Sequence, residues 1–311
     1  MTDLAWVALL LTLVWTGAVV GFVRHRAARA HPETGRRFFR HPTAALGLTV
    51  LVLFGTLALA APWLAPYRPS AQLDIVGLQN QAPSWLHPLG TDLYSRDIYS
   101  RLVFAARISL GIGTLGMLLA LTVGGLVGAA AGYFGRWVDA ALMRFVDVGL
   151  AVPRIFVVFV AIAVWNRLGV IPLVLLLGLT GWFTTSRVVR AEVLSLGERP
   201  FVEAARALGA GSWRIIARHI LPNTAAPLIV SAALGIGNMM LLEAALSFLG
   251  VGVQPPTPSW GNMIADGREQ LATAPWTTLF AGLAIALVVM ALHAVGDGLR
   301  DALDPRHDHD A

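Results

Sequence analysis

Residues 198–222 read ERPFVEAARALGAGSWRIIARHILP, and they join two long apolar runs at 169–187 and 225–250. Pro200 suits the first position of a helix, because proline has no amide hydrogen to leave unpaired there. Gly209 tolerates a positive φ, so the chain can turn after that helix. The segment therefore predicts a helix–turn–helix bracket that projects between two membrane spans.

Each short helix of the bracket carries a predicted apolar stripe. The first stripe follows the i, i+3, i+4, i+7 spacing of one helix face and has small residues in its middle: Phe201, Ala204, Ala205 and Leu208. Ser212 is the expected N-cap of the second helix, and Pro222 is expected to end it. The second stripe consists of Trp213, Ile216, Ala217 and Ile220. Such a bracket suits the transmission of force from a soluble cytoplasmic motor, and the alternative is an amphipathic hairpin that rests on lipid headgroups.

Apolar runs extend on both sides of the bracket. Seven of them approach the roughly 20 residues that a spanning helix needs: 4–23, 44–65, 108–132, 142–165, 169–187, 225–250 and 277–297. The runs are continuous and long, whereas a membrane strand alternates over about ten residues. With 56% hydrophobic and 13% charged residues, the chain has more apolar surface than a soluble core can hide. We therefore predict an all-α, polytopic transmembrane helical bundle.

Arginine placement sets the expected orientation. Arginines concentrate in the connections at 24–40 and 190–223, around the short turn at 133–141, and after the last run. The positive-inside rule assigns these regions to the cytoplasm, which puts the C-terminus inside and the N-terminus outside if the first run spans. The connections at 66–107 and 251–276 then lie outside, either as passive linkers or as a surface for an external partner.

The first apolar run needs separate treatment, because an N-terminal apolar stretch can be a signal peptide. Asp3 precedes this run and arginines follow it, which is the reverse of a secretory signal. We interpret residues 1–40 as an N-out transmembrane anchor helix with a basic cytoplasmic linker. An uncleaved signal and an overextended predicted start are the alternatives.

Composition excludes several classes of function. All 23 basic residues are arginine, so the chain lacks the P-loop lysine of a Walker A nucleotide site. Cysteine is absent, which removes disulfides, thiolate metal sites and cysteine nucleophiles. Topology explains the net charge of +5, so nucleic acid is not an expected partner. No catalytic residues and no metal site are predicted.

The segment Glu203–Asn223, EAARALGAGSWRIIARHILPN, resembles the EAA loop of ABC importer permeases. The shared features are Glu-Ala-Ala, a glycine six residues after the glutamate, and a terminal Leu-Pro. Four further stretches resemble the second permease of dipeptide, oligopeptide and nickel importers: HPLGTDLYSRDIYSRLVFAARISLGIG (87–113), AGYFGRWVDAALMRFVDV (131–148), LSFLGVGVQPPTPSWGNMI (246–264) and DGLRDALDPR (297–306). The resemblance covers about 40 to 306, nearly the whole chain.

The resemblance implies a six-helix permease domain at 41–306, with an external loop at 66–107 and a cytoplasmic EAA coupling loop at 190–223. The helix at 4–23 is extra to that pattern, and residues 307–311 form a polar tail. The expected location is the bacterial cytoplasmic (inner) membrane. By carry-over, the residues that would couple to an ATPase are Glu203, Ala204, Ala205, Leu208, Gly209, Leu221 and Pro222.

The same resemblance implies a transport subunit that is not an enzyme and binds no cofactor itself. Its implied partners are a homologous second permease, two cytoplasmic ATPase subunits that hold ATP and Mg, an extracytoplasmic solute-binding protein and membrane lipid. Dipeptides or oligopeptides are the first expectation for cargo. The alternatives are nickel or another small solute within the same family, and a stand-alone secondary transporter or channel.

Several polar or small residues within the spans carry separate expectations. Glu243 lines the transport pathway, is a fixed hydrogen-bonding group at a helix break near Gly235, Gly237 and Asn238, or takes part in proton coupling. Asn238 is a further candidate for lining the pathway. Arg154 is expected to reach the inner interface or a carboxylate such as that of Asp147. Gly124, Gly128 and Gly132 share one face of a predicted span and are expected to allow close helix packing. In the external loop, Asp92 and Asp97 are expected to form local salt bridges or to contact the binding protein.

Overall fold

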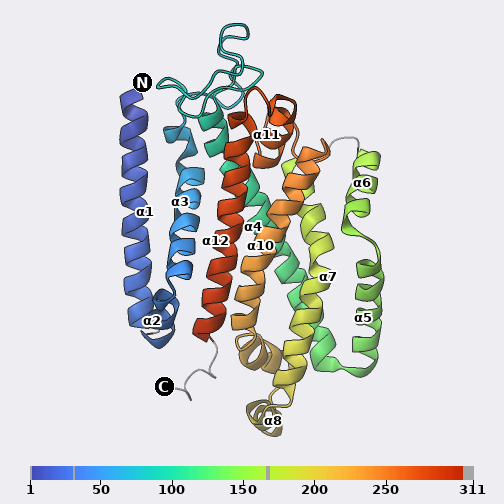
Figure 1. Ribbon diagram of the computed structural model, residues 1–311. Coiled ribbons are helices and arrows are strands. Elements are labelled where there is room, and N and C mark those ends of the chain that lie inside the picture. The colour runs from blue at the N-terminus through green and yellow to red at the C-terminus, as the bar shows by residue number, and fades with distance from the viewer. Residues whose placement is uncertain (1, 31, 166–168, 304–311) are drawn as a thin grey trace. The chain divides into compact units, whose positions relative to one another are not determined.

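The computed structural model describes residues 2–30, 32–165 and 169–303, and every regular element in these ranges is helical (Figure 1). Five of the described helices are long and apolar enough to cross a membrane: α3 (Pro42–Leu64), α4 (Ile98–Phe134), α7 (Val170–Gly197), α10 (Ala225–Phe248) and α12 (Trp276–Leu303). The predicted all-α polytopic fold is confirmed. The helix that covers the predicted run at 108–132 begins earlier than expected, at Ile98.

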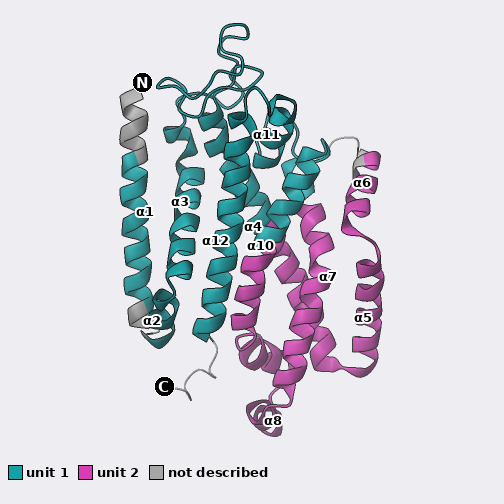
Figure 2. Ribbon diagram, viewed as in Figure 1, with its two compact units in different colours: residues 1–114, 167–173, 236–311 teal, residues 115–166, 174–235 magenta. Residues whose placement is uncertain are grey.

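The chain divides into two compact units (Figure 2). Unit 1 comprises residues 1–114, 167–173 and 236–311, and unit 2 comprises residues 115–166 and 174–235. Unit 1 holds α1 (Thr2–Ala30), α2 (Pro32–Arg40), α3, α11 (Trp260–Gly267), the 3-10 helix η2 (Arg268–Gln270) and α12. The single helix α1 covers the predicted run at 4–23.

The core of unit 1 forms around α12, which packs against α3 and α11. Trp260 at the start of α11 is completely buried, and its indole nitrogen donates a hydrogen bond to the carbonyl of Leu102 over 3.1 Å. A β-carbon added at Gly47 of α3 would lie 2.8 Å from the carbonyl oxygen of Ala291 on α12. The two helices therefore approach each other closely where glycine leaves room.

Close packing also joins α4 and α7 within unit 2. A β-carbon added at Gly124 would lie 2.7 Å from the carbonyl oxygen of Trp182, and one added at Gly132 would lie 2.8 Å from the β-carbon of Val193. Gly128 meets α7 between these two positions. The prediction that this glycine series serves helix packing is confirmed.

The single helix predicted at 142–165 is wrong. The chain forms α5 (Arg136–Ala151) and α6 (Arg154–Trp165), and Val152 between them is extended, with φ −88° and ψ 118°. Proline explains the break, because Pro153 lacks an amide hydrogen and disfavours helical backbone at the residue before it.

Of the two expectations for Arg154, the pair with a carboxylate such as that of Asp147 is wrong. Its Nε donates a hydrogen bond to the hydroxyl of Thr180 over 2.7 Å, and a second guanidinium nitrogen donates to the carbonyl of Leu177. Asp147 instead accepts a hydrogen bond from Arg187 over 2.6 Å. Among the described residues, the guanidinium of Arg154 thus donates to neutral acceptors of α7 and pairs with no carboxylate.

Candidate functional site

The bracket between α7 and α10 consists of α8 (Pro200–Ala207), α9 (Ser212–Ile215) and the π-helix η1 (Ile216–Ile220) (Figure 1). Pro200 occupies the first helical position of α8, with Arg199 as N-cap. Gly209 has φ +79°, the left-handed conformation that glycine adopts at little cost. The predicted helix start and turn are both confirmed.

The inner face of the bracket packs on α7. Val202 and Ala205 of α8 are buried in a cluster that includes Val189 and Val193 of α7. The guanidinium of Arg206 also lies over the ring of Tyr133 at the end of α4, 5.4 Å from its centroid. The α8 helix is therefore attached to two membrane helices of its own unit.

The residues of the predicted stripe on α8 differ in their exposure to solvent. Ala205 is largely buried, whereas Phe201 and Ala204 are exposed and Leu208 is 88% exposed. Glu203 and Gly209 are exposed as well. Part of the predicted stripe thus forms an outward surface of small and apolar side chains, because a short helix that rests on α7 buries only one narrow face.

The second stripe differs from its prediction. Trp213 is 70% exposed and Ala217 is exposed, while the consecutive residues Ile215 and Ile216 are buried. The amide of Leu221 donates to the carbonyl of Ile216 over 2.8 Å, five residues back, which is the π-helical spacing. A π-turn rotates the following side chains relative to an α-helix, so the 3.6-residue period does not identify the buried face.

The second half of the bracket begins and ends close to the predicted residues. The N-cap of α9 is Gly211, so Ser212 occupies the first helical position instead of the cap. Leu221 is half-buried against the cluster under the bracket, and Pro222 is exposed. The π-helix ends at Ile220, before Pro222, in agreement with the expected stop.

An open hollow lies on the outer surface of the bracket. Apolar side chains of α8 and of the turn after it line the hollow together with basic side chains of α9 and η1: Phe201, Ala204, Ala205, Leu208, Ala210, Arg214 and His219. The hollow is wide and exposes Leu208 almost fully. Such a surface suits contact with a folded protein better than enclosure of a small molecule.

Glu243 lies at the centre of a buried hydrogen-bond network in unit 1. Its side chain is fully buried and accepts hydrogen bonds from the hydroxyls of Ser247, over 2.7 Å, and Ser109, over 3.2 Å. The α10 helix runs without interruption through Gly235 and Gly237, so no helix break accompanies this carboxylate. Asn238, five residues earlier in α10, is exposed.

The serine hydroxyls of this network hold the connection that follows α10. Ser109 accepts a hydrogen bond from the amide of Trp260 over 3.2 Å, and Ser247 accepts one from the amide of Val253 over 3.0 Å. Sequence reasoning missed both serines. The sequence signal that could have found them is a serine in each of two apolar helices, one of which also contains the intramembrane acid Glu243.

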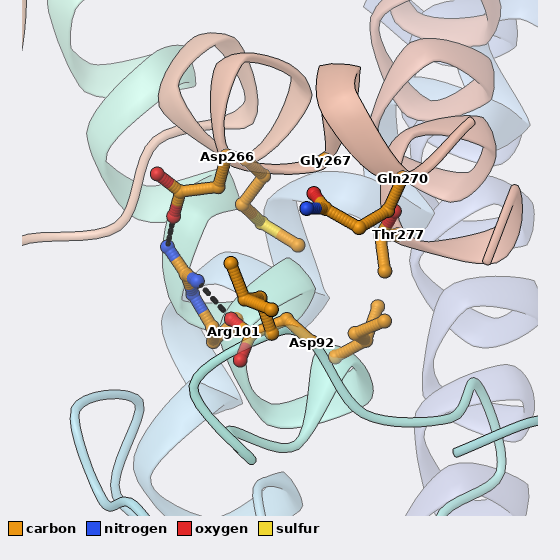
Figure 3. Close-up of a pocket in the computed structure, with 9 residues that line it drawn as sticks. Asp92, Arg101, Asp266, Gly267, Gln270 and Thr277 are labelled. Carbon is orange, nitrogen blue, oxygen red and sulfur yellow. Dashed lines mark hydrogen bonds and ion pairs between the residues drawn. The ribbon is translucent and has the colours of Figure 1, made fainter. Parts of the chain in front are cut away.

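A second polar network joins the loop before α4 and the first turn of α4 to α11 (Figure 3). Asp92 accepts a hydrogen bond from Nε of Arg96 over 2.7 Å and another from Arg101. Asp266 accepts one from Arg96 over 2.7 Å and one from Arg101 over 3.0 Å. Asp97 accepts hydrogen bonds from Nδ1 of His87 over 3.0 Å and from the amide of Ser100 over 2.8 Å. Asp92 and Asp97 therefore form local pairs, the first of the two expected alternatives.

The comparison with protein families identifies the class of this membrane protein. The model of the binding-protein-dependent transport system inner membrane component matches residues 124–309, which include the bracket and three of the five candidate spans in full. The chain belongs to this family. A second model, for the N-terminal transmembrane domain of oligopeptide transport permease C, matches residues 33–83 of the permease.

Curated relatives resemble the permease over most of its length. A dipeptide transport system permease protein of Alkalihalophilus pseudofirmus is 40% identical over 279 residues, which are 88% of this chain and 89% of the relative. A putative peptide permease protein of Brucella suis is 41% identical over 276 residues, 88% and 90% of the two chains. A glutathione transport system permease protein of Pectobacterium atrosepticum is 38% identical over 291 residues, 93% and 96% of the two chains.

These matches confirm the predicted resemblance to permeases of the dipeptide and oligopeptide type. The permease is a multi-pass inner-membrane component of an ABC importer, a kind of subunit that does not itself hydrolyse ATP. A stand-alone transporter or channel is not favoured by any of these findings.

Proposed function

We propose that the permease imports dipeptides or oligopeptides as half of a pore that it forms with a homologous second permease. Two cytoplasmic ATPase subunits would hold ATP and Mg, and an extracytoplasmic solute-binding protein would deliver the cargo. The names of the relatives, which specify dipeptide, peptide and glutathione systems, support a peptide cargo over nickel.

The ATPase contacts the outer face of α8, around Glu203, Ala204 and Leu208. The observation that carries this proposal is the division of α8 into an exposed outer face and an inner face anchored on α7 through Val202 and Ala205. Movement of the docked helix would therefore pull on a candidate span. A motor whose open and closed forms bind α8 differently by a few kcal/mol suffices to shift the permease between two states.

The orientation follows from arginine placement. The cytoplasmic side carries the bracket, the turn before α5 and the C-terminus, and residues 1–40 form an N-out anchor helix with its linker. Residues 41–306 are the permease domain, and 307–311 lie outside the described residues. Near the middle of α10, exposed Asn238 faces the transport pathway, while Glu243 fixes the position of α10 from its buried side.

Co-purification in detergent tests the docking proposal. All candidate subunits are co-expressed, and the ATPase retained by the permease pair is quantified for Ala204→Arg and Leu208→Arg. Both substitutions change exposed residues, so we expect the permease pair to assemble and the retained ATPase to fall at least tenfold. Ala217→Arg is the matched control, because Ala217 is exposed on the same connection but lies outside the hollow.

Two outcomes of this experiment would contradict the proposal. Equal ATPase loss in Ala204→Arg and Ala217→Arg would show that any added charge on the connection is harmful and would refute a specific α8 contact. If the wild-type permease retains no ATPase when every subunit is present, the ATP-driven coupling proposal fails.

A further inference from the structure

An open hollow lies at the N-terminal end of α4, within unit 1 and apart from the bracket. Its walls are the loop after α3, with Ser70, the first turns of α4, with Phe104 and Arg107, and the segment 256–258 that precedes α11. Phe104 is half-buried, whereas Arg107 is exposed. The hollow thus combines apolar walls, two hydroxyl residues and one cation.

Arg107 differs from the arginines beside it. Arg96 and Arg101 share the carboxylates of Asp92 and Asp266. Across the described ranges 2–30, 32–165 and 169–303, no hydrogen bond or ion pair reaches the guanidinium of Arg107. Its charge is therefore available to a ligand from outside the chain.

Topology does not account for this charge. The positive-inside rule explains arginines on the cytoplasmic side of a membrane, but the N-terminal end of α4 is its external end in the proposed orientation. Arg107 also lies beside the apolar run that begins at residue 108, where an uncompensated charge is costly. Because Arg107 is exposed, its guanidinium remains solvated at the end of the span and can bind an anion.

The wall opposite Arg107 is held rigidly. The side-chain amide of Asn262 donates to the carbonyl of Thr257 over 2.8 Å and to that of Val253 over 3.2 Å. Asn262 and Ser259 also form a reciprocal cap at the start of α11. Both residues are buried, so segment 256–258 is fixed before any ligand arrives, which lowers the entropic cost of binding.

We propose that this hollow binds the C-terminal carboxylate of the transported peptide, with Arg107 as its cationic partner. A planar guanidinium donates two parallel hydrogen bonds to a carboxylate, and Ser70 and Thr257 supply hydroxyls at the rim. The phenyl ring of Phe104 offers apolar surface to the rest of the peptide. This inference rests on the proposed peptide cargo and adds to it a specific entry subsite.

Thiol labelling tests the hollow directly, because the chain contains no cysteine. The assembled importer in lipid nanodiscs carries Thr257→Cys, with either Arg107 or Arg107→Gln in the same chain. Labelling rates are measured with a sulfonated and an uncharged maleimide. Thr273→Cys, an exposed position outside the hollow, is the matched control for reagent reactivity.

If Arg107 attracts anions, Arg107→Gln lowers the ratio of sulfonated to uncharged labelling about three- to tenfold at Thr257→Cys, the size expected for one charge several ångströms away in a wet site. The ratio at Thr273→Cys stays unchanged. Equal ratios with and without Arg107 at Thr257→Cys would overturn the inference.

Peptide protection then identifies the source of the carboxylate. Trialanine should slow the labelling of Thr257→Cys at least threefold more than trialanine amide does, and Arg107→Gln should remove that difference. Equal protection by acid and amide in the presence of Arg107 contradicts the inference. Full protection by the binding protein without any peptide also overturns it, because the carboxylate then belongs to the binding protein.

Uptake of labelled trialanine into proteoliposomes separates this inference from the proposed function. Uptake without Arg107-dependent protection refutes the subsite and leaves the peptide importer intact. Absence of uptake in the wild type refutes the peptide cargo, while the labelling ratio still reports on the charge in the hollow, since labelling requires no ATP.

Discussion

The carboxylate of Glu243 on α10 lies 3.2 Å from the hydroxyl of Ser109 on α4, which donates a hydrogen bond to it. The same hydroxyl accepts a hydrogen bond from the amide of Trp260 at the start of α11. One serine thus joins three segments that are far apart in the sequence. Both partners are buried, so water cannot replace the lost hydrogen bonds if the hydroxyl is removed.

Ser109→Ala is therefore expected to destabilise the permease by about 1–3 kcal/mol, the usual cost of leaving buried polar groups without partners. The measurement is the thermal unfolding midpoint in detergent. Thr122→Ala, on the same helix, removes a hydroxyl that donates only to the Leu118 carbonyl one turn earlier, and should change the midpoint little. Equal effects of the two substitutions would exclude a special role for the Ser109 contact.

Asp92→Ala should destabilise the fold by about 3 kcal/mol, because it leaves the buried guanidinium of Arg101 with only one carboxylate partner. Glu269→Ala removes a partner from the exposed pair with Arg268, 3.7 Å apart, and should cost less than about 1 kcal/mol. Chemical denaturation in mixed micelles measures both. If Asp92→Ala lowers the free energy of unfolding no more than Glu269→Ala does, the network is not needed for stability.

Gly128→Ala should weaken the packing of α4 on α7. An added β-carbon would lie 2.8 Å from that of Val189 and would also overlap the backbone of α7, which cannot move aside without shifting the helix. We expect a loss of about 1–3 kcal/mol. Gly125→Ala is the control, since nothing lies within 4 Å of an added β-carbon there and alanine favours helix. Comparable unfolding midpoints for the two variants would contradict the packing argument.

The pair between Arg190 and Asp139 predicts a pH dependence. The guanidinium of Arg190 donates two hydrogen bonds to the Asp139 carboxylate, one of them over 2.6 Å, and these hold the pKa of Asp139 below its ordinary value of 3.8. A lowered pKa means that the pair stabilises the fold fully above about pH 4 and that this contribution is lost as pH falls through the folded-state pKa.

Asp139→Asn should accordingly lower the unfolding midpoint at neutral pH, and its difference from the wild type should shrink in acid. Asp147→Asn is the matched control, because Asp147 and Arg187 form an exposed pair through one hydrogen bond. A difference between wild type and Asp139→Asn that is the same at pH 7 and pH 3 would show that the Asp139–Arg190 pair does not titrate as argued.

Length and hydrophobicity were sufficient to locate most of the helices. The apolar runs at 44–65, 169–187, 225–250 and 277–297 each correspond to a candidate span, because a bilayer requires a long run of apolar residues whatever the neighbouring helices are. The run at 142–165 failed since hydrophobicity carries no information about backbone continuity. Pro153 within that run was the missed signal.

The sequence predicted the helix start and the turn of the bracket, but not which faces of its helices are buried. Pro200 and Gly209 mark local backbone geometry, which depends on the residue itself, so both predictions were confirmed. The buried faces depend on where α7 lies and on a π-turn, and periodicity alone encodes neither. Ala205, for example, packs in the cluster under the bracket and also borders the outer hollow.

By itself, the sequence determined an all-α membrane protein with a helix–turn–helix bracket and no lysine for a P-loop, because these properties depend on composition and on short-range backbone preference. Only the tertiary structure decided which face of α8 is free and which serines hold Glu243. Tertiary structure also decided that Arg101 is paired, while Arg107 has no partner among the described residues. Each of these depends on contacts between residues distant in the chain, and such contacts form only when the helices pack.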